Sequence, residues 1–198
     1  MMLPIIIFVL AGFGNYKTIY GQYTVARSQY AQYHTTSTRQ NAIAETAKVL
    51  KARNQLIIEY LRLLRQRFAD TTQVGNYAQN VIYLDLETQI NWFLNWEKGI
   101  DALESPRELN TSSENWQKYW ENVLEKVKAA KKEIVSFRLE KFQLQAEGLD
   151  YASTSASVKS LITTKFEQSR TARNVGKIEE SRDYLISAIK AIYESTQK

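Results

Sequence analysis

The sequence predicts an all-α protein: an elongated antiparallel bundle of four or five helices with coiled-coil-like seams and an apolar N-terminal leader. Three observations support this fold class. Two long stretches place apolar residues at alternating steps of four and three, the spacing of a helix packed along its length. The 198 residues include only two prolines and seven glycines, few for a β-rich protein. An apolar content of 44% is enough to form one core.

Residues 1–21 are expected to form a signal peptide or a short membrane anchor. Residues 3–13 are an uncharged apolar run that only Pro4 and Gly12 interrupt. This length fits the hydrophobic region of a signal peptide better than a membrane span, which needs about 20 residues. Two features do not fit a signal peptide well: no Lys or Arg precedes the run, and the residues up to Gly21 form only a tolerable cleavage site. The alternative is an apolar helix that is folded into the bundle.

Residues 22–36 are expected to form a Tyr-rich stalk. Tyrosines follow the apolar run at near-helical spacing, and their amphipathic rings suit a membrane interface. If the leader is removed, the remaining tyrosines would instead pack on the bundle. The tyrosines concerned are Tyr16, Tyr20, Tyr23, Tyr30 and Tyr33.

Residues 37–198 are expected to form the helical bundle domain. Capping-box spacings at Ser37–Gln40 and Thr111–Glu114, together with glycines just beyond the periodic stretches, set the boundaries. The expected helices are 38–72, 77–98, 112–147, 154–174 and 178–196. Because residues 22–69 carry eight bases against two acids and residues 70–110 two bases against seven acids, the first two helices should lie side by side and antiparallel.

Residues 176–189 resemble the second helix of a tetratricopeptide repeat. Gly176, Ser181, Leu185 and Ala188 occupy the small and apolar positions that this family uses. The preceding helix departs from the repeat, and a solenoid needs at least three units of about 34 residues. We therefore expect a generic helical hairpin here.

Several kinds of chemistry have no counterpart in the sequence. The chain has no cysteine and one histidine, His34, which lacks the surroundings of a catalytic triad and cannot supply a histidine-rich metal site. Phosphate-binding glycine loops are absent, so we expect no catalytic residue, metal or cofactor. The net charge of +5 invites a nucleic-acid interpretation, but no known binding module surrounds the basic residues and we consider nucleic acid an unlikely partner.

Two candidate sites remain. Asn54 occupies an apolar seam, where a buried amide commonly fixes the register or the partner at some cost in stability. Tryptophan pairs one turn apart come level in an antiparallel hairpin, where they form either a ligand platform or a core plug. These residues are Trp92, Trp96, Trp116 and Trp120.

We expect a non-enzymatic structural or protein-interaction component of a bacterial-type cell envelope. It would be exported or membrane-tethered, although a cytoplasmic location stays open. Its partner would be another protein or a second copy, engaged through helix faces, with membrane contact through the N-terminus. The alternative is a helical module that binds a glycan or a small apolar ligand at the tryptophans.

Overall fold

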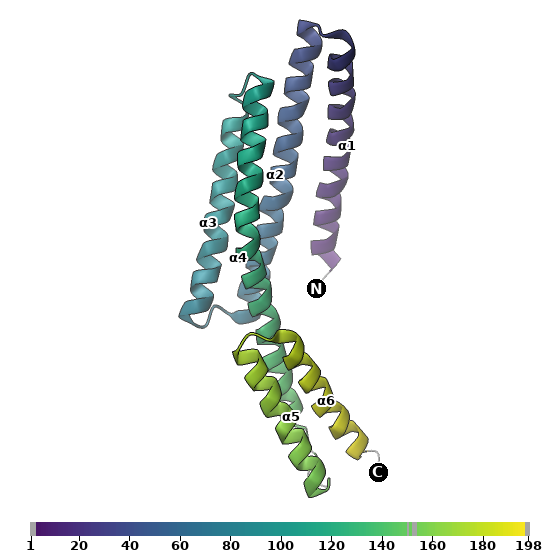
Figure 1. Cartoon of the computed structure of the whole chain (residues 1–198), viewed down its shortest axis with the longest axis vertical. Helices are drawn as coiled ribbons and strands as arrows, with labels where there is room; N and C mark the ends of the chain where they lie inside the picture. The colour runs from purple at the N-terminus through teal and green to yellow at the C-terminus, as the bar shows by residue number, and fades with distance from the viewer. Residues whose placement is uncertain (1–2, 150, 152–153, 197–198) are drawn as a thin grey trace. The chain divides into compact units, whose positions relative to one another are not determined.

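The computed structural model describes residues 3–149, 151 and 154–196, with side chains from residue 12 onward. These residues form helices and no strand, which confirms the all-α class, whereas the expected count of four or five helices is not confirmed. The helices are α1 (Leu3–Tyr33), α2 (Thr36–Thr72), α3 (Tyr77–Ile100), α4 (Pro106–Glu147), α5 (Ala156–Asn174) and α6 (Ile178–Thr196) (Figure 1).

Helix α1 runs without a break from Leu3 to Tyr33, which covers most of the segments expected to be leader and stalk. It lies beside α2, and among its side chains that the structure describes, Ala26 is buried, with 1% exposure. The helix ends where His34 turns to a positive φ of 50° and its N–H donates to the carbonyl of Tyr30 at 3.0 Å. Among the described helices, none combines the length and the hydropathy that a membrane crossing requires.

The starts of α2 and α4 differ from the predicted capping boxes. Thr35 caps α2, because its hydroxyl accepts the N–H of Thr38 at 3.2 Å while the Thr38 hydroxyl accepts the N–H of Thr35 at 3.1 Å. Ser105 and Glu108 make the same reciprocal contacts at 3.2 and 3.0 Å in front of α4. Pro106 takes the first helical position, which its fixed φ suits. The predicted box Thr111–Glu114 therefore lies inside α4.

The chain divides into two compact units. Unit 1 comprises the residues up to Ala69 together with Val74–Ala130, and unit 2 comprises Asp70–Gln73 and the residues from Lys131 onward. Helix α4 thus contributes its first part to unit 1 and its second part to unit 2.

Unit 1 is an antiparallel arrangement of α1, α2, α3 and the first part of α4 (Figure 1). Its large, fully buried side chains include Ile58, Leu61 and Phe68 of α2, Leu86, Phe93 and Ile100 of α3, and Leu109 and Val123 of α4. Ile57 lies three residues after Asn54, at the next step of the apolar seam that the sequence predicts, but it is half-buried, and its neighbour Ile58 is fully buried instead. A strict coiled-coil seam is therefore not confirmed.

The side-by-side pairing of α2 and α3 is confirmed. Arg65 of α2 forms an ion pair with Glu87 of α3. A second acid of α3, Asp85, pairs with Lys126 of α4 at 2.5 Å. Charge complementarity thus extends over three helices, with each exposed pair worth only about 0–1 kcal/mol.

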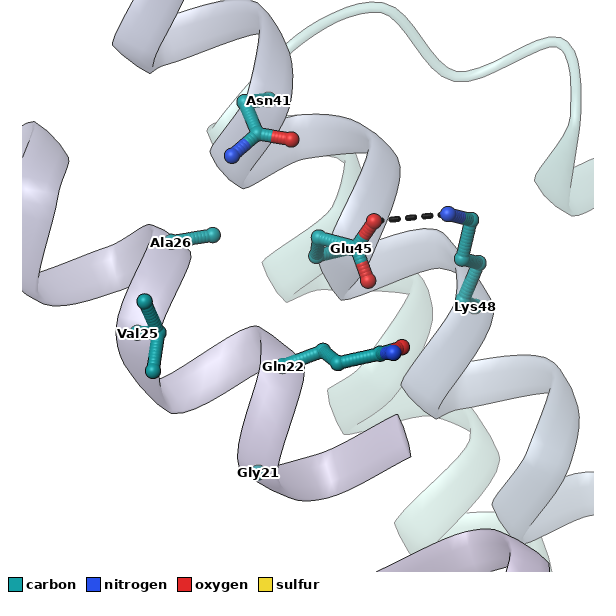
Figure 2. Close-up of a pocket in the computed structure, with 7 residues that line it drawn as sticks. All are labelled: Gly21, Gln22, Val25, Ala26, Asn41, Glu45 and Lys48. Atoms are coloured by element: carbon teal, nitrogen blue, oxygen red, sulfur yellow. Dashed lines mark hydrogen bonds and ion pairs between the residues drawn. The ribbon is translucent and has the colours of Figure 1, made fainter. Parts of the chain in front are cut away.

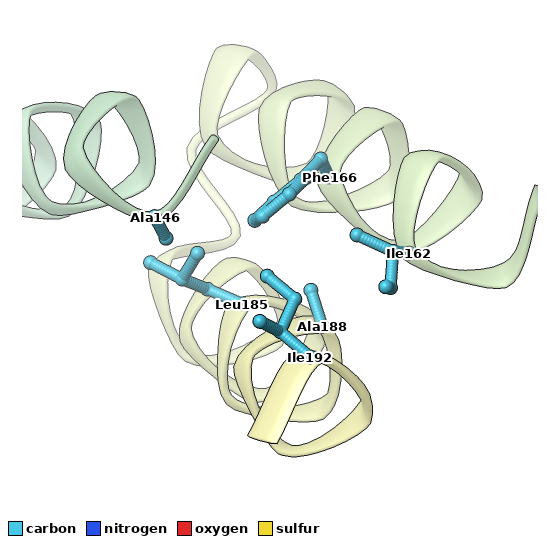
Figure 3. Close-up of a cluster of buried hydrophobic side chains, with 6 residues drawn as sticks. All are labelled: Ala146, Ile162, Phe166, Leu185, Ala188 and Ile192. Atoms are coloured by element: carbon cyan, nitrogen blue, oxygen red, sulfur yellow. The ribbon is translucent and has the colours of Figure 1, made fainter. Parts of the chain in front are cut away.

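Unit 2 has its own core, formed by the end of α4 with α5 and α6. A cluster of buried side chains in this core comprises Ala146, Ile162, Phe166, Leu185, Ala188 and Ile192 (Figure 3). Helices α5 and α6 contact each other through small residues, since the hydroxyl of Ser169 donates to the carbonyl of Ser181 at 2.8 Å. This is the helical hairpin that the sequence predicts.

Candidate functional site

The four tryptophans form one aromatic cluster in unit 1, in which three of them contact the ring of Phe93 and Trp96 contacts Trp116. Trp92 stacks on Tyr119 with ring centroids 3.5 Å apart and planes inclined by 10°. Trp116 lies 6.3 Å from Trp96 and 6.4 Å from Trp120, also measured between centroids. The tryptophan pairs of α3 and α4 therefore come level, as predicted.

These rings pack mainly against one another. Trp116 is 4% exposed, and Trp92, Trp96 and Trp120 are half-buried. The indole N–H of Trp96 is buried and has no hydrogen-bond partner among the described residues. A ligand platform at the tryptophans stays a prediction. The most specific observation in its favour is the unpartnered indole N–H of Trp96.

Asn54 is fully buried, and its amide is satisfied within the chain. Its nitrogen donates to the carbonyl of Phe93 at 3.1 Å and to a carboxylate oxygen of Glu97 at 2.8 Å. Its oxygen accepts the indole N–H of Trp116 at 2.9 Å. Gln55 donates to both oxygens of Glu97, at 2.7 and 2.6 Å. Asn54 therefore joins α2 to α3 and α4 through its hydrogen bonds, and its role in fixing the register stays a prediction.

A second feature of unit 1 is a groove of about 520 Å³ between α1, α2 and the start of α4. We call it the Tyr/Arg groove. Four tyrosines and three arginines line it together with small and apolar side chains, and none of its described lining residues is acidic. The lining residues are Tyr16, Tyr20, Tyr23, Arg27, Tyr30, Arg39, Ala42, Ile43, Thr46, Val49, Leu50, Arg53, Pro106, Leu109, Asn110 and Ser113.

Arg53 is the least exposed cation of this groove. Its guanidinium carbon lies 4.0 Å from the ring centroid of Trp116, and one of its terminal nitrogens donates to the hydroxyl of Ser113 at 3.1 Å. Its Nε atom is buried without a hydrogen-bond partner in the described part of the chain. Desolvation lowers the pKa of Arg53, and the neighbouring Tyr16 opposes this shift. The side chain nevertheless keeps its charge at neutral pH.

A smaller hollow of about 480 Å³ lies along the contact between α1 and α2 (Figure 2). Glu45 reaches into it from α2 and pairs with Lys48 at 2.6 Å, as the dashed line shows. The second carboxylate oxygen of Glu45 is buried and has no partner among the described groups. Because this hollow already holds an ion pair, its electrostatic character differs from that of the Tyr/Arg groove.

The described residues include no cluster of His, Asp and Glu that could hold a metal ion. His34 is exposed at the end of α1, where its ring contacts Tyr30 edge-on. No protein-family model, curated protein or solved structure matches this chain.

Sequence reasoning missed the arginines of the groove. Arg27, Arg39 and Arg53 are far apart in the sequence and belong to no local motif. The near-helical spacing of the tyrosines was the available signal, and it placed Tyr16, Tyr20, Tyr23 and Tyr30 on one face of a helix. What the spacing could not indicate is which surface of α2 and α4 lies opposite them.

Proposed function

We propose that this chain is a non-enzymatic structural or protein-interaction component of a bacterial-type cell envelope. It would be exported or tethered through residues 1–21, and it would engage a protein partner or a second copy through helix faces. The proposal includes the coiled-coil-like seams that the alternating steps of four and three residues predict. A helix of the partner would pack along such a seam.

The observation that supports this proposal is an apolar stripe on α3. Tyr77, Val81 and Leu84 are 83, 41 and 53% exposed, and they lie one turn apart on the same face of the helix. Single exposed apolar residues are common, whereas an aligned set marks an interaction surface. Anchors with this spacing are what an amphipathic partner helix buries when it docks.

Photo-crosslinking tests the partner. Because the chain has no cysteine, Val81→Cys provides a unique attachment point for a benzophenone maleimide. Lys128→Cys is the matched control, since Lys128 is exposed on another helix, α4, and is not part of the stripe. We expect one discrete adduct from Val81→Cys in envelope extracts, lost when Leu84→Asp is added. Equal adducts from both positions, or none from Val81→Cys, would contradict the proposal.

The same variant tests the location. A membrane-impermeant maleimide should label Val81→Cys in intact or outer-membrane-permeabilised cells. Labelling that requires lysis of the inner membrane would place the chain inside the cell and end the envelope part of the proposal.

A second candidate function is a ligand-binding module at the tryptophans. The buried, unpartnered N–H of Trp96 favours it, because a buried donor without an acceptor costs about 1–3 kcal/mol that a ligand oxygen would recover. A soluble glucan oligosaccharide and decanol are suitable probes. Saturable quenching of tryptophan fluorescence that Trp96→Phe abolishes is the expected result, and quenching that survives Trp96→Phe would exclude this site.

A further inference from the structure

We propose that the Tyr/Arg groove binds a small amphiphilic anion: a carboxylate or phosphate group attached to a ring-shaped or apolar body. This activity is independent of the protein contact proposed for α3. The groove lies on α1, α2 and the start of α4, and its lining includes no residue of α3.

The cationic side of the groove begins with Arg53. Its guanidinium is half-buried, held over Trp116 and fixed at one nitrogen by Ser113, whereas its buried Nε has no partner among the described residues. A partly desolvated cation without a counter-ion is unfavourable, and an anion that reaches it gains more than it would in water. The lowered pKa of Arg53 has the same cause, since desolvation is its largest contribution.

Two further arginines line the same groove from two different helices. Arg27 comes from α1 and Arg39 from α2, and both are exposed. Within the described part of the chain, no acidic side chain lines the groove and neither arginine has an ion pair. Three guanidinium groups around one hollow without a neutralising acid favour an anionic ligand, because their planar donors match carboxylate and phosphate oxygens.

The rest of the lining favours a ligand with a ring or an apolar body. Tyr16, Tyr23 and Tyr30 line the groove and are half-buried, and a tyrosine ring offers apolar surface together with a polar hydroxyl. Val49 and Leu50 are buried residues that contribute apolar surface to the same hollow. The volume of about 520 Å³ falls in the range of small-molecule pockets.

Calorimetry on the full chain tests the chemical class with three probes. Phenyl phosphate carries both the anion and the ring, inorganic phosphate carries only the anion, and benzyl alcohol carries only the ring. We expect saturable binding of phenyl phosphate, weaker binding of inorganic phosphate and no detectable binding of benzyl alcohol. If phenyl phosphate shows no saturable binding, or binds no better than inorganic phosphate, the proposal fails.

A pair of double variants tests the location. Arg27→Gln/Arg39→Gln removes two charges from the groove, and Lys17→Gln/Arg62→Gln removes two exposed charges elsewhere on α1 and α2. Because all four side chains are exposed, both variants should keep the wild-type circular dichroism spectrum. We expect the groove variant to bind phenyl phosphate about tenfold more weakly, because Arg27 and Arg39 are exposed and each contact from an exposed charge contributes only modestly. The control should change it less than about twofold, because its charges lie outside the groove.

Two results would overturn the assignment. Equal losses in the two double variants would show a general effect of net charge, and an unchanged affinity in the groove variant would place the binding elsewhere. A short single-stranded oligonucleotide serves as a competitor: if it binds more tightly than phenyl phosphate and with a steep salt dependence, the groove is a nucleic-acid surface and the small-anion proposal is wrong.

Discussion

The indole N–H of Trp116 donates a hydrogen bond of 2.9 Å to the side-chain oxygen of Asn54, which joins α4 to α2 inside unit 1. Both side chains are buried, at 4 and 0% exposure. From the sequence alone, a buried Asn in an apolar seam predicts that Leu at this position raises stability. The structure reverses the sign, because the partners of the amide are buried with it.

Replacing Asn54 with Leu should lower the free energy of unfolding by about 1–3 kcal/mol, since it leaves the N–H of Trp116 buried without an acceptor. Urea denaturation measures this change. Trp116→Phe removes the donor, so the double variant Asn54→Leu/Trp116→Phe should lose less than the sum of the two single variants. Additive losses would show that the hydrogen bond contributes nothing of its own.

Replacing Tyr119 with Phe should destabilise unit 1 by about 1–2 kcal/mol, because the hydroxyl donates to the largely buried Gln89 at 2.6 Å and Phe leaves that oxygen unpaired. The stack on Trp92 should persist, since the ring is unchanged. Thermal unfolding measures the loss. Tyr193→Phe is the control, because Tyr193 is 63% exposed, and an equal loss there would contradict the argument.

The same hydroxyl should produce an alkaline pH dependence. Burial raises the pKa of Tyr119 above its ordinary value near 10. A group whose folded-state pKa is raised contributes stability that is fully present below the unfolded pKa and lost as pH rises through the folded pKa. Stability should therefore fall above pH 10, and less so in Tyr119→Phe. Identical alkaline profiles for the two proteins would refute this origin.

Glu108 should titrate below its ordinary range. The hydroxyl of Ser105 makes the largest contribution to lowering the pKa of the Glu108 carboxyl, followed by the backbone N–H groups of Glu104 and Ser105. A depressed pKa contributes stability above the unfolded value, near 4.5, that is lost as pH falls through the folded value. Carbon NMR titration should show the shift in the wild type and a partial return toward the ordinary pKa in Ser105→Ala. An unchanged pKa in Ser105→Ala would contradict the reciprocal cap.

Replacing Gly176 with Ala should cost about 1 kcal/mol, because the residue has a φ of +77° at the end of α5. The turn is a Schellman motif, in which the N–H of Lys177 donates to the carbonyl of Ala172 at 2.8 Å and that of Gly176 to Arg173 at 2.9 Å. Gly21→Ala is the matched control. A Cβ at Gly21 meets nothing within 4 Å inside α1, so it should stabilise the chain by up to about 1 kcal/mol. Equal effects of the two substitutions on the thermal midpoint would exclude backbone strain as the cause.

The helices could be predicted wherever one face is apolar. Burial of that face determines that the segment is helical, and the helix ends where the apolar pattern ends. The expected 178–196 coincides with α6, and the expected 38–72 and 77–98 differ from α2 and α3 by two residues at one boundary each. The predicted start of α4 was wrong because the sequence offers two capping boxes there, Ser105–Glu108 and Thr111–Glu114. The box at Ser105 is the better signal because Pro106 follows it directly. Proline lacks an N–H, and the first position of a helix needs no N–H donor.

The candidate sites could be predicted only in part. Asn54 and the tryptophans stand out because each departs from its local pattern, and the structure brings Asn54 into contact with Trp116. The hydrogen bonds of Asn54 to Phe93 and Glu97 depend on how α3 faces α2, which no local spacing specifies. For the same reason the convergence of distant arginines on one groove required the structure.

The placement of the indole rings determines what optical probes can report. All four tryptophans of the chain belong to unit 1, so tryptophan emission follows the unfolding of that unit alone. Circular dichroism at the helical band follows both units, because each is built from helices. Comparing the two signals in a single denaturant titration therefore measures whether the units melt as one cooperative body, without any label.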